Sequence, residues 1–213
     1  MPRYYPVTLN LEGQTCLVVG GGAVADRKVK TLIAHQARVV LVSPDVSDSL
    51  RELADLGRIE LHQRPFVPED TDGVFLVFCA TNDREVNRGV VEACQNRRVL
   101  VNVVDDPELC SFLVPAIHRQ GPLSIAVSTD GNSPSAARLI RQHLEKEFGP
   151  EYGRLLEMVG AARRKIIGTV GDPEKRTAIL KELVDEELLA LIRSGDVEAA
   201  KERLAKCLSS WLG

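Results

Sequence analysis

The fold is decided by residues 15–30, which read TCLVVGGGAVADRKVK. Residues 16–19 are a short apolar run rich in Val, as expected of a buried parallel strand, and residues 23–35 have the pattern of a helix. The turn between them, Gly20-x-Gly22-x-x-Ala25, has the G-x-G-x-x-G/A spacing of a dinucleotide-binding turn. Glycines alone could form an ordinary loop, but between a strand and a helix they predict a dinucleotide site.

Each position of this turn has a physical role. Gly20 permits a tight turn off the strand, and Gly22 has no Cβ, so a pyrophosphate can approach the backbone. Ala25 is small enough for the helix to pack closely on the strand. The N–H groups and the positive end of the helix then hold the phosphates. We therefore expect cofactor contacts at Gly20, Gly21 and Gly22.

The composition limits the class of protein. The chain has 213 residues, of which 44% are apolar and 27% charged, as in ordinary globular proteins. The net charge of -3 gives no basic field for nucleic acid. The apolar run 74–80 is too short to span a bilayer, and the N-terminus has no apolar core of signal-peptide length. Five cysteines without C-x-x-C spacing suggest free thiols. We expect a cytoplasmic protein without nucleic-acid or membrane partners.

Strands and helices alternate up to about residue 112, which predicts a doubly wound parallel sheet. The expected strands after the first are 38–42, 59–62, 74–80 and 98–101, with helices over 47–56 and 83–94 between them.

The pattern changes after residue 112. Two strands, 111–117 and 122–128, are expected to pair in antiparallel fashion, and a helix over 134–148 follows. Further helices are expected over 152–167, 173–193 and 197–212. The predicted fold class is α/β: a Rossmann-like NAD-binding domain (1–112), a small α+β dimerisation segment (113–148) and a helical C-terminal domain (149–213). The middle segment is too small to bury its own core, so we expect it to pair with its copy.

The end of the second strand indicates which cofactor binds. Ser43, Pro44 and Asp45 follow the strand, and no Lys or Arg lies between Val39 and Leu50. A 2′-phosphate would find no cationic partner there, which favours NAD over NADP. Asp45 could equally be a residue that only begins the next helix.

Polar residues follow the later strands at the same edge of the sheet. Thr81 and Asn82 should face the nucleotide, as should Asn102 and Val103. Asp105, beside a bound nicotinamide, could take or give a proton. Both segments would also suit plain turns. The four histidines are scattered, and His118 is expected to face solvent. No catalytic His or Lys of a hydroxy-acid dehydrogenase stands out.

Four stretches in one order resemble the precorrin-2 dehydrogenases of the siroheme synthase amino-terminal family, some of which are also sirohydrochlorin ferrochelatases. They are YYPVTLNLEGQTCLVVGGGAVADRKVKTL, FCATND, VNVVDDPELCSFLVPA and SIAVSTDGNSPSAARLIRQHLE, and they lie within residues 1–147.

This resemblance implies NAD-dependent oxidation of precorrin-2 to sirohydrochlorin, with ferrous ion as a further substrate in some members and transient metal near Asp105. It implies a homodimer with the tetrapyrrole in a cleft. The family's catalytic aspartate falls on Asp105. Its cofactor contacts fall on Gly22, Ala23, Val24, Pro44 and Asp45. The substrate is a polycarboxylate, for which the candidate ligands are Arg119, Arg138, Arg141, Ser128 and Asn132. Each Arg could instead belong to a solvated helix face, and a non-enzymatic NAD-sensing domain is the alternative function.

Overall fold

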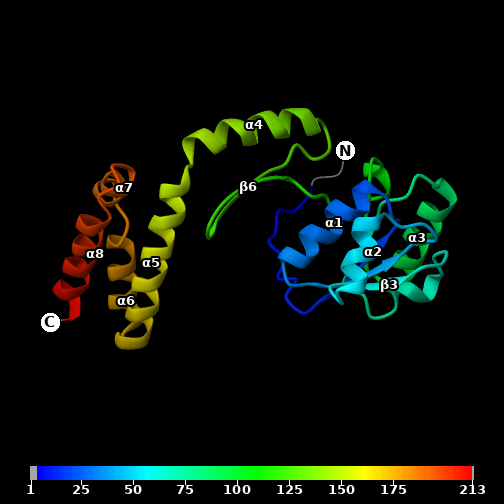
Figure 1. Cartoon of the computed structure of the whole chain (residues 1–213). Helices are drawn as coiled ribbons and strands as arrows, with labels where there is room; N and C mark the ends of the chain where they lie inside the picture. Colours follow the sequence, from blue (N-terminus) through cyan, green and yellow to red (C-terminus); the bar gives the residue numbers. More distant parts are fainter. Residues whose placement is uncertain (1–3, 213) are drawn as a thin grey trace. The chain divides into compact units, whose positions relative to one another are not determined.

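The computed structural model describes residues 4–212, and the side chains up to residue 209 (Figure 1). It divides into two compact units, Met1–Val114 and Pro115–Gly213. Within the described part of the chain, no helix is long and apolar enough to cross a membrane.

The first unit is a five-stranded parallel sheet in the order β3-β2-β1-β4-β5. The predicted Rossmann-like sheet is thereby confirmed. The strands β1 and β4 lie at its centre, and their residues are buried on both faces, as continuous apolar runs predict. The strands are β1 (Thr15–Val19), β2 (Arg38–Val42), β3 (Glu60–His62), β4 (Leu76–Cys79) and β5 (Leu100–Val103).

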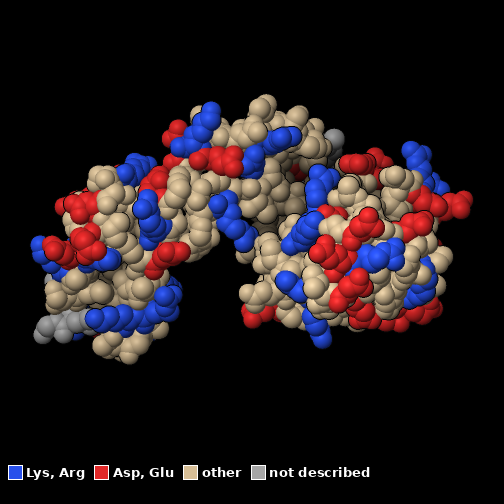
Figure 2. Space-filling view, viewed as in Figure 1, with Lys and Arg blue, Asp and Glu red and all other residues tan. Residues whose placement is uncertain are grey.

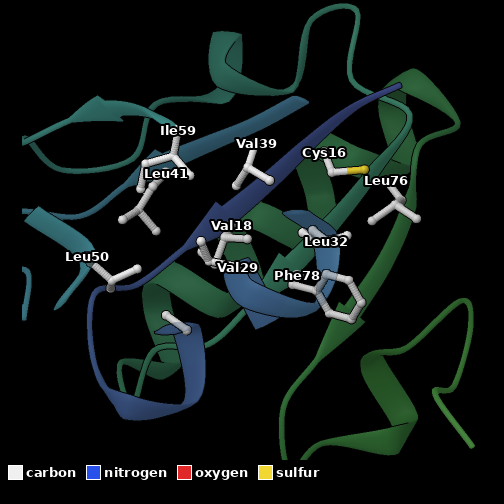
Figure 3. Close-up of a cluster of buried hydrophobic side chains, with 11 residues drawn as sticks. Cys16, Val18, Val29, Leu32, Val39, Leu41, Leu50, Ile59, Leu76 and Phe78 are labelled. Carbon is white, nitrogen blue, oxygen red and sulfur yellow. The ribbon is translucent and has the colours of Figure 1, made fainter. Parts of the chain in front are cut away.

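Helices cover both faces of this sheet. One apolar cluster places α1 (Ala23–Ala34) and α2 (Asp48–Asp55) on one face, and Figure 3 shows Val29 and Leu32 of α1 against Val18 and Phe78 of the sheet. The other cluster joins α3 (Arg84–Arg97) to the opposite face. Short 3-10 turns follow β3 (η1, Pro68–Thr71) and β5 (η2, Pro107–Leu109).

The fifth strand begins later than the sequence indicates. We expected residues 98–101, but α3 continues to Arg97, and Arg98 ends it in the left-handed conformation with φ of 57°. Arg98 N–H and Val99 N–H satisfy the last carbonyls of the helix, so the strand begins only at Leu100. The prediction failed because this helix ends without a glycine.

The second unit opens with an antiparallel pair, β6 (Ala116–Gln120) and β7 (Leu123–Val127), followed by α4 (Pro134–Glu147). The expected first strand began at residue 111. The backbone of Ser111 and Phe112 is instead bonded to β5, and Pro115 has no N–H, so pairing begins at Ala116.

His118 is buried, and our expectation that it faces solvent was wrong. Only 3% of its surface is exposed, and its Nε2 lies 2.6 Å from the carbonyl oxygen of Phe148. His118 alternates with the exposed Ile117 and Arg119 along β6, so it belongs to the face that α4 covers.

The rest of the chain is helical, as predicted, with its own apolar core. The expected helix over 173–193 is two helices, because Asp185 leaves helical geometry and its carboxylate caps the second one through Leu188 N–H. The four helices are α5 (Pro150–Thr169), α6 (Pro173–Glu182), α7 (Glu186–Arg193) and α8 (Val197–Leu212). All five cysteines are free thiols.

Candidate functional site

The first unit has a cleft of about 750 Å³ at the carboxyl edge of its sheet. This volume lies within the range of cofactor sites, about 300–1,000 Å³. The turns after β1, β2 and β4 line it, and so does the loop before η1. Eight of the expected cofactor residues come together here: Gly20, Gly21, Gly22, Ser43, Pro44, Asp45, Thr81 and Asn82.

The three glycines have different physical reasons to be glycine. Gly20 has φ of +114°, and a Cβ there would overlap the carbonyl oxygen of Ala80. A Cβ on Gly21 would overlap the carbonyl oxygen of Asp45. A Cβ on Gly22 would meet nothing within 4 Å. The fold therefore requires the first two glycines, whereas Gly22 leaves open space beside the first turn of α1.

The N-terminus of α1 faces that open space with free donors. Gly22 caps the helix without a side-chain hydrogen bond, and the first bond within the helix runs from Asp26 N–H to the Gly22 carbonyl. The N–H groups of the first turn therefore lack helical partners and suit an anion. Ala23 and Val24 belong to this turn, although they do not line the cleft.

Asn87 of α3 holds the turn after β4 through hydrogen bonds of its side-chain amide. Thr81 Oγ1 donates to Asn87 Oδ1 at 2.8 Å, and Asn87 Nδ2 donates to the Thr81 carbonyl at 3.3 Å. Cys79 Sγ donates to the same Oδ1 at 3.0 Å. These bonds hold Thr81 at the edge of the cleft. Asn87 carried no recognisable sequence signal.

Pro65 and Phe66, in the loop before η1, and Pro68 at the start of η1 also line the cleft. Asp70 holds this loop: it accepts from Arg64 Nη1 at 2.8 Å, Arg64 Nη2 at 2.5 Å and Val67 N–H at 2.9 Å. Burial acts to raise the pKa of Asp70, but these hydrogen bonds outweigh it and the pKa is lowered.

We expect Asp70→Asn to lower the melting temperature at pH 7 by about 2–4 °C, because a hydrogen-bonded charge is lost. A carboxyl with a lowered pKa stabilises the fold above its unfolded pKa of about 4, and that contribution disappears as the pH falls through the folded pKa. The difference in melting temperature between Asp70→Asn and the parent protein, measured by thermal unfolding, should therefore become smaller below about pH 4. Glu69→Gln, at an exposed neighbour, is the matched control.

Two expected cofactor residues lie inside the fold. Asn102 is 7% exposed, and its Nδ2 donates to the Phe112 carbonyl at 3.0 Å. Val103 is 2% exposed, and its N–H donates to Cys110 Sγ at 3.2 Å. Neither lines the cleft.

Asp105 lies on the loop after β5 and is exposed. Its backbone is left-handed, with φ of 62°, a conformation that Asp and Asn tolerate better than most residues. Within residues 4–209, its carboxylate forms no hydrogen bond or ion pair. The loop turns back because Cys110 Sγ donates to the carbonyls of Val103 and Asp106 at 3.2 and 3.3 Å.

The expected substrate ligands all lie in the second unit. Arg119 and Arg138 are exposed, whereas Arg141 pairs with Glu145 at 2.6 Å. Ser128 Oγ accepts from Asp130 N–H at 3.1 Å, and Asn132 Nδ2 donates to the Thr129 carbonyl at 2.8 Å. Their contact with a substrate stays a prediction.

Three family models match consecutive parts of the chain. They are described as putative NAD(P)-binding (residues 7–116), sirohaem biosynthesis protein central (120–147) and sirohaem synthase dimerisation region (151–208). The first alone covers more than half of the chain.

Similar proteins and a solved structure point to the same family as these models. The chain is 41% identical to the siroheme synthase of Thioalkalivibrio sulfidiphilus, over 98% of this chain and 43% of that protein. It is 36% identical to that of Nitrosomonas europaea, over 97% and 44%. The chain thus spans less than half the length of these curated relatives. The solved structure of SirC, precorrin-2 dehydrogenase, matches with a TM-score of 0.78 and 27% identity, over 93% of this chain and 100% of that one. The order of the three matched regions, together with these similarities, shows that the chain belongs to the siroheme synthase amino-terminal family.

Proposed function

We propose that the chain oxidises precorrin-2 to sirohydrochlorin with NAD as the acceptor. The observation that carries this proposal is the cleft at the carboxyl edge of the sheet, where Gly22 leaves room for a pyrophosphate at the end of α1. The similarity to SirC supports the identity of the substrate. The family description covers both NAD and NADP, so the choice between them is part of the proposal.

The charge of the cleft favours NAD. Asp45, Asp83 and Glu85 line it, and neither Lys nor Arg is among its lining residues. A 2′-phosphate on the adenosine ribose would lie near these carboxylates without a cation to pair with it.

The reaction removes a hydride and a proton from the tetrapyrrole. The bound nicotinamide supplies the hydride acceptor. Asp105 then has one of two roles: its carboxylate takes the proton, or it holds the macrocycle so that the hydride faces the nicotinamide. The exposed position of Asp105, without a partner among the described residues, leaves its oxygens available for either role.

We further propose ferrous ion as a second substrate, inserted into sirohydrochlorin at the same loop. Two pyrrole protons must leave as the metal enters, and the exposed carboxylate of Asp105 is suited to accept them one at a time and to release each to water. The other candidate, a non-enzymatic NAD-sensing domain, would need the glycine turn but not Asp105.

The deciding experiment gives the purified chain enzymatically made precorrin-2 and follows NADH formation by absorbance. We expect turnover with NAD, and with NADP at least about tenfold less, a difference of about 1.4 kcal/mol. Repeating the assay with ferrous ion tests chelation. NAD binding without any NADH formation would instead support the sensing domain.

We expect a homodimer at micromolar concentration. The family's dimerisation region covers 151–208, whereas we expect pairing through 113–148 from the small size of that segment. Exposed apolar side chains occur in both: Leu139 at 66% and Ile140 at 48% in α4, and Ile167 at 45% in α5. If 113–148 pairs, Leu139→Arg should dissociate the dimer in sedimentation velocity, and Ile167→Arg should not. A monomeric parent protein would contradict the proposal.

A further inference from the structure

Lys28 on α1 is a cation without an anionic partner. It is half-buried, and its Nζ lies 4.8 Å from the centroid of the Phe78 ring. Among the residues that the structure describes, no carboxylate lies within ion-pair distance of it. Lys30, two residues later on the same helix, is by contrast paired with Asp26 at 2.7 Å. Partly buried ammonium groups are normally paired.

The surroundings of Lys28 belong to the carboxyl end of β4 and β5. Phe78 is the last residue but one of β4, and in register it lies beside Asn102 of β5. Its ring meets that of Phe112 edge to face, with centroids 5.4 Å apart. The ammonium therefore lies over the Phe78 ring, which packs on Phe112, on the α1 face of the sheet near the strand ends.

Lys28 is connected to the segment that follows β5 through two aromatic rings, because Phe78 beneath its ammonium packs on Phe112. Burial is the main cause that lowers the pKa of Lys28, and Arg27 lowers it further, while the thiol of Cys110 acts in the opposite direction. Cys110 is the residue that closes this loop onto Val103 and Asp106. On the face in view in Figure 2, acidic and basic side chains are interspersed over the first unit.

We propose that Lys28 binds the substrate, pairing its ammonium with a carboxylate of the tetrapyrrole. This inference rests on the proposed function. A polycarboxylate macrocycle that approaches Asp105 would supply the anion that Lys28 lacks. The Phe78 ring limits the water around the ammonium, which strengthens a charge-assisted hydrogen bond. Lys28 thereby fixes which edge of the macrocycle faces the nicotinamide.

The test is a titration with sirohydrochlorin, followed by its absorbance, of the full-length parent, Lys28→Met and Lys30→Met. Methionine keeps the apolar stem over Phe78 and removes only the charge. We expect Lys28→Met to weaken binding about tenfold to a hundredfold, the usual effect of losing a hydrogen bond to a charged group. The KM for precorrin-2 should rise, with kcat within about threefold. NAD affinity should be unchanged, and Lys28→Arg should restore most of the binding.

The stability of the variant separates binding from a structural role. Removing an unpaired, half-buried charge should leave the melting temperature unchanged or raise it. Equal sirohydrochlorin affinity in the parent protein and in Lys28→Met, or an equal loss in Lys30→Met, would overturn the inference alone. No binding by the parent protein would overturn the proposed function, and the role of Lys28 with it.

Discussion

Gly22→Val should abolish NAD binding while the protein stays folded. Gly22 has an extended backbone, with φ of −88°, that any residue adopts, and an added Cβ would meet no protein atom within 4 Å. The isopropyl group would instead fill the space beside the first turn of α1, where a pyrophosphate must approach the N–H groups. Valine is a poorer helix cap than glycine, so a small drop in melting temperature, within about 4 °C, is expected. Calorimetric titration with NAD measures the binding.

Gly21→Ala is the matched control, because its Cβ would overlap the Asp45 carbonyl oxygen. That variant should lower the melting temperature by more than Gly22→Val does, because the Asp45 carbonyl must move to admit the Cβ. The pair of variants therefore separates a glycine that the fold requires from one that the ligand requires. A folded Gly22→Val protein that titrates with NAD like the parent would refute the cofactor assignment.

The glycine turn and the apolar runs were enough to predict the sheet of the first unit. A parallel strand buried on both faces has no polar alternation, so β1 and β4 are visible as continuous runs such as CLVV and LVFC. The ends of helices were harder to predict from the sequence. Arg98 ends α3 in the left-handed conformation without glycine, and Asp185 divides an apolar periodicity that continues through both α6 and α7. Apolar spacing does not reveal such ends, because local hydrogen bonds of the backbone and of the Asp185 carboxylate decide them.

The parts of the candidate site that the backbone forms could be predicted from the sequence, whereas the parts that depend on side-chain directions were harder to predict. The turns after β1, β2 and β4 meet at one edge by topology alone, so their residues could be placed from the sequence. Asn102 could not, because strand alternation directs its side chain to the α1 face, where the Phe112 carbonyl accepts its hydrogen bond. Lys28 was missed for a different reason: a lysine within an amphipathic helix is ordinary in the sequence, and only the structure shows the Phe78 ring beneath it.

Asp105→Asn should lower the rate of precorrin-2 oxidation by about two powers of ten or more, the usual effect of losing a general base. The substitution suits this position because Asn, like Asp, tolerates the left-handed backbone at φ of 62°. It keeps the size of the side chain and removes only the charge. NAD affinity, the melting temperature and dimerisation should therefore stay unchanged, which alanine, with its poor left-handed propensity, would not guarantee. Single-turnover formation of NADH from precorrin-2 is the measurement.

Asp106→Asn is the control for this experiment. Asp106 precedes η2 with φ of −135°, and its carbonyl oxygen accepts from Cys110 Sγ, so its main interaction is through the backbone. We expect its oxidation rate to stay within about threefold of the parent protein, far from the loss that a missing general base causes. If Asp105→Asn also loses ferrous insertion, one carboxylate serves both reactions; if only oxidation is lost, the pyrrole protons leave through another group. An Asp105→Asn protein that forms NADH as fast as the parent would leave Asp105 as a turn residue without a catalytic role.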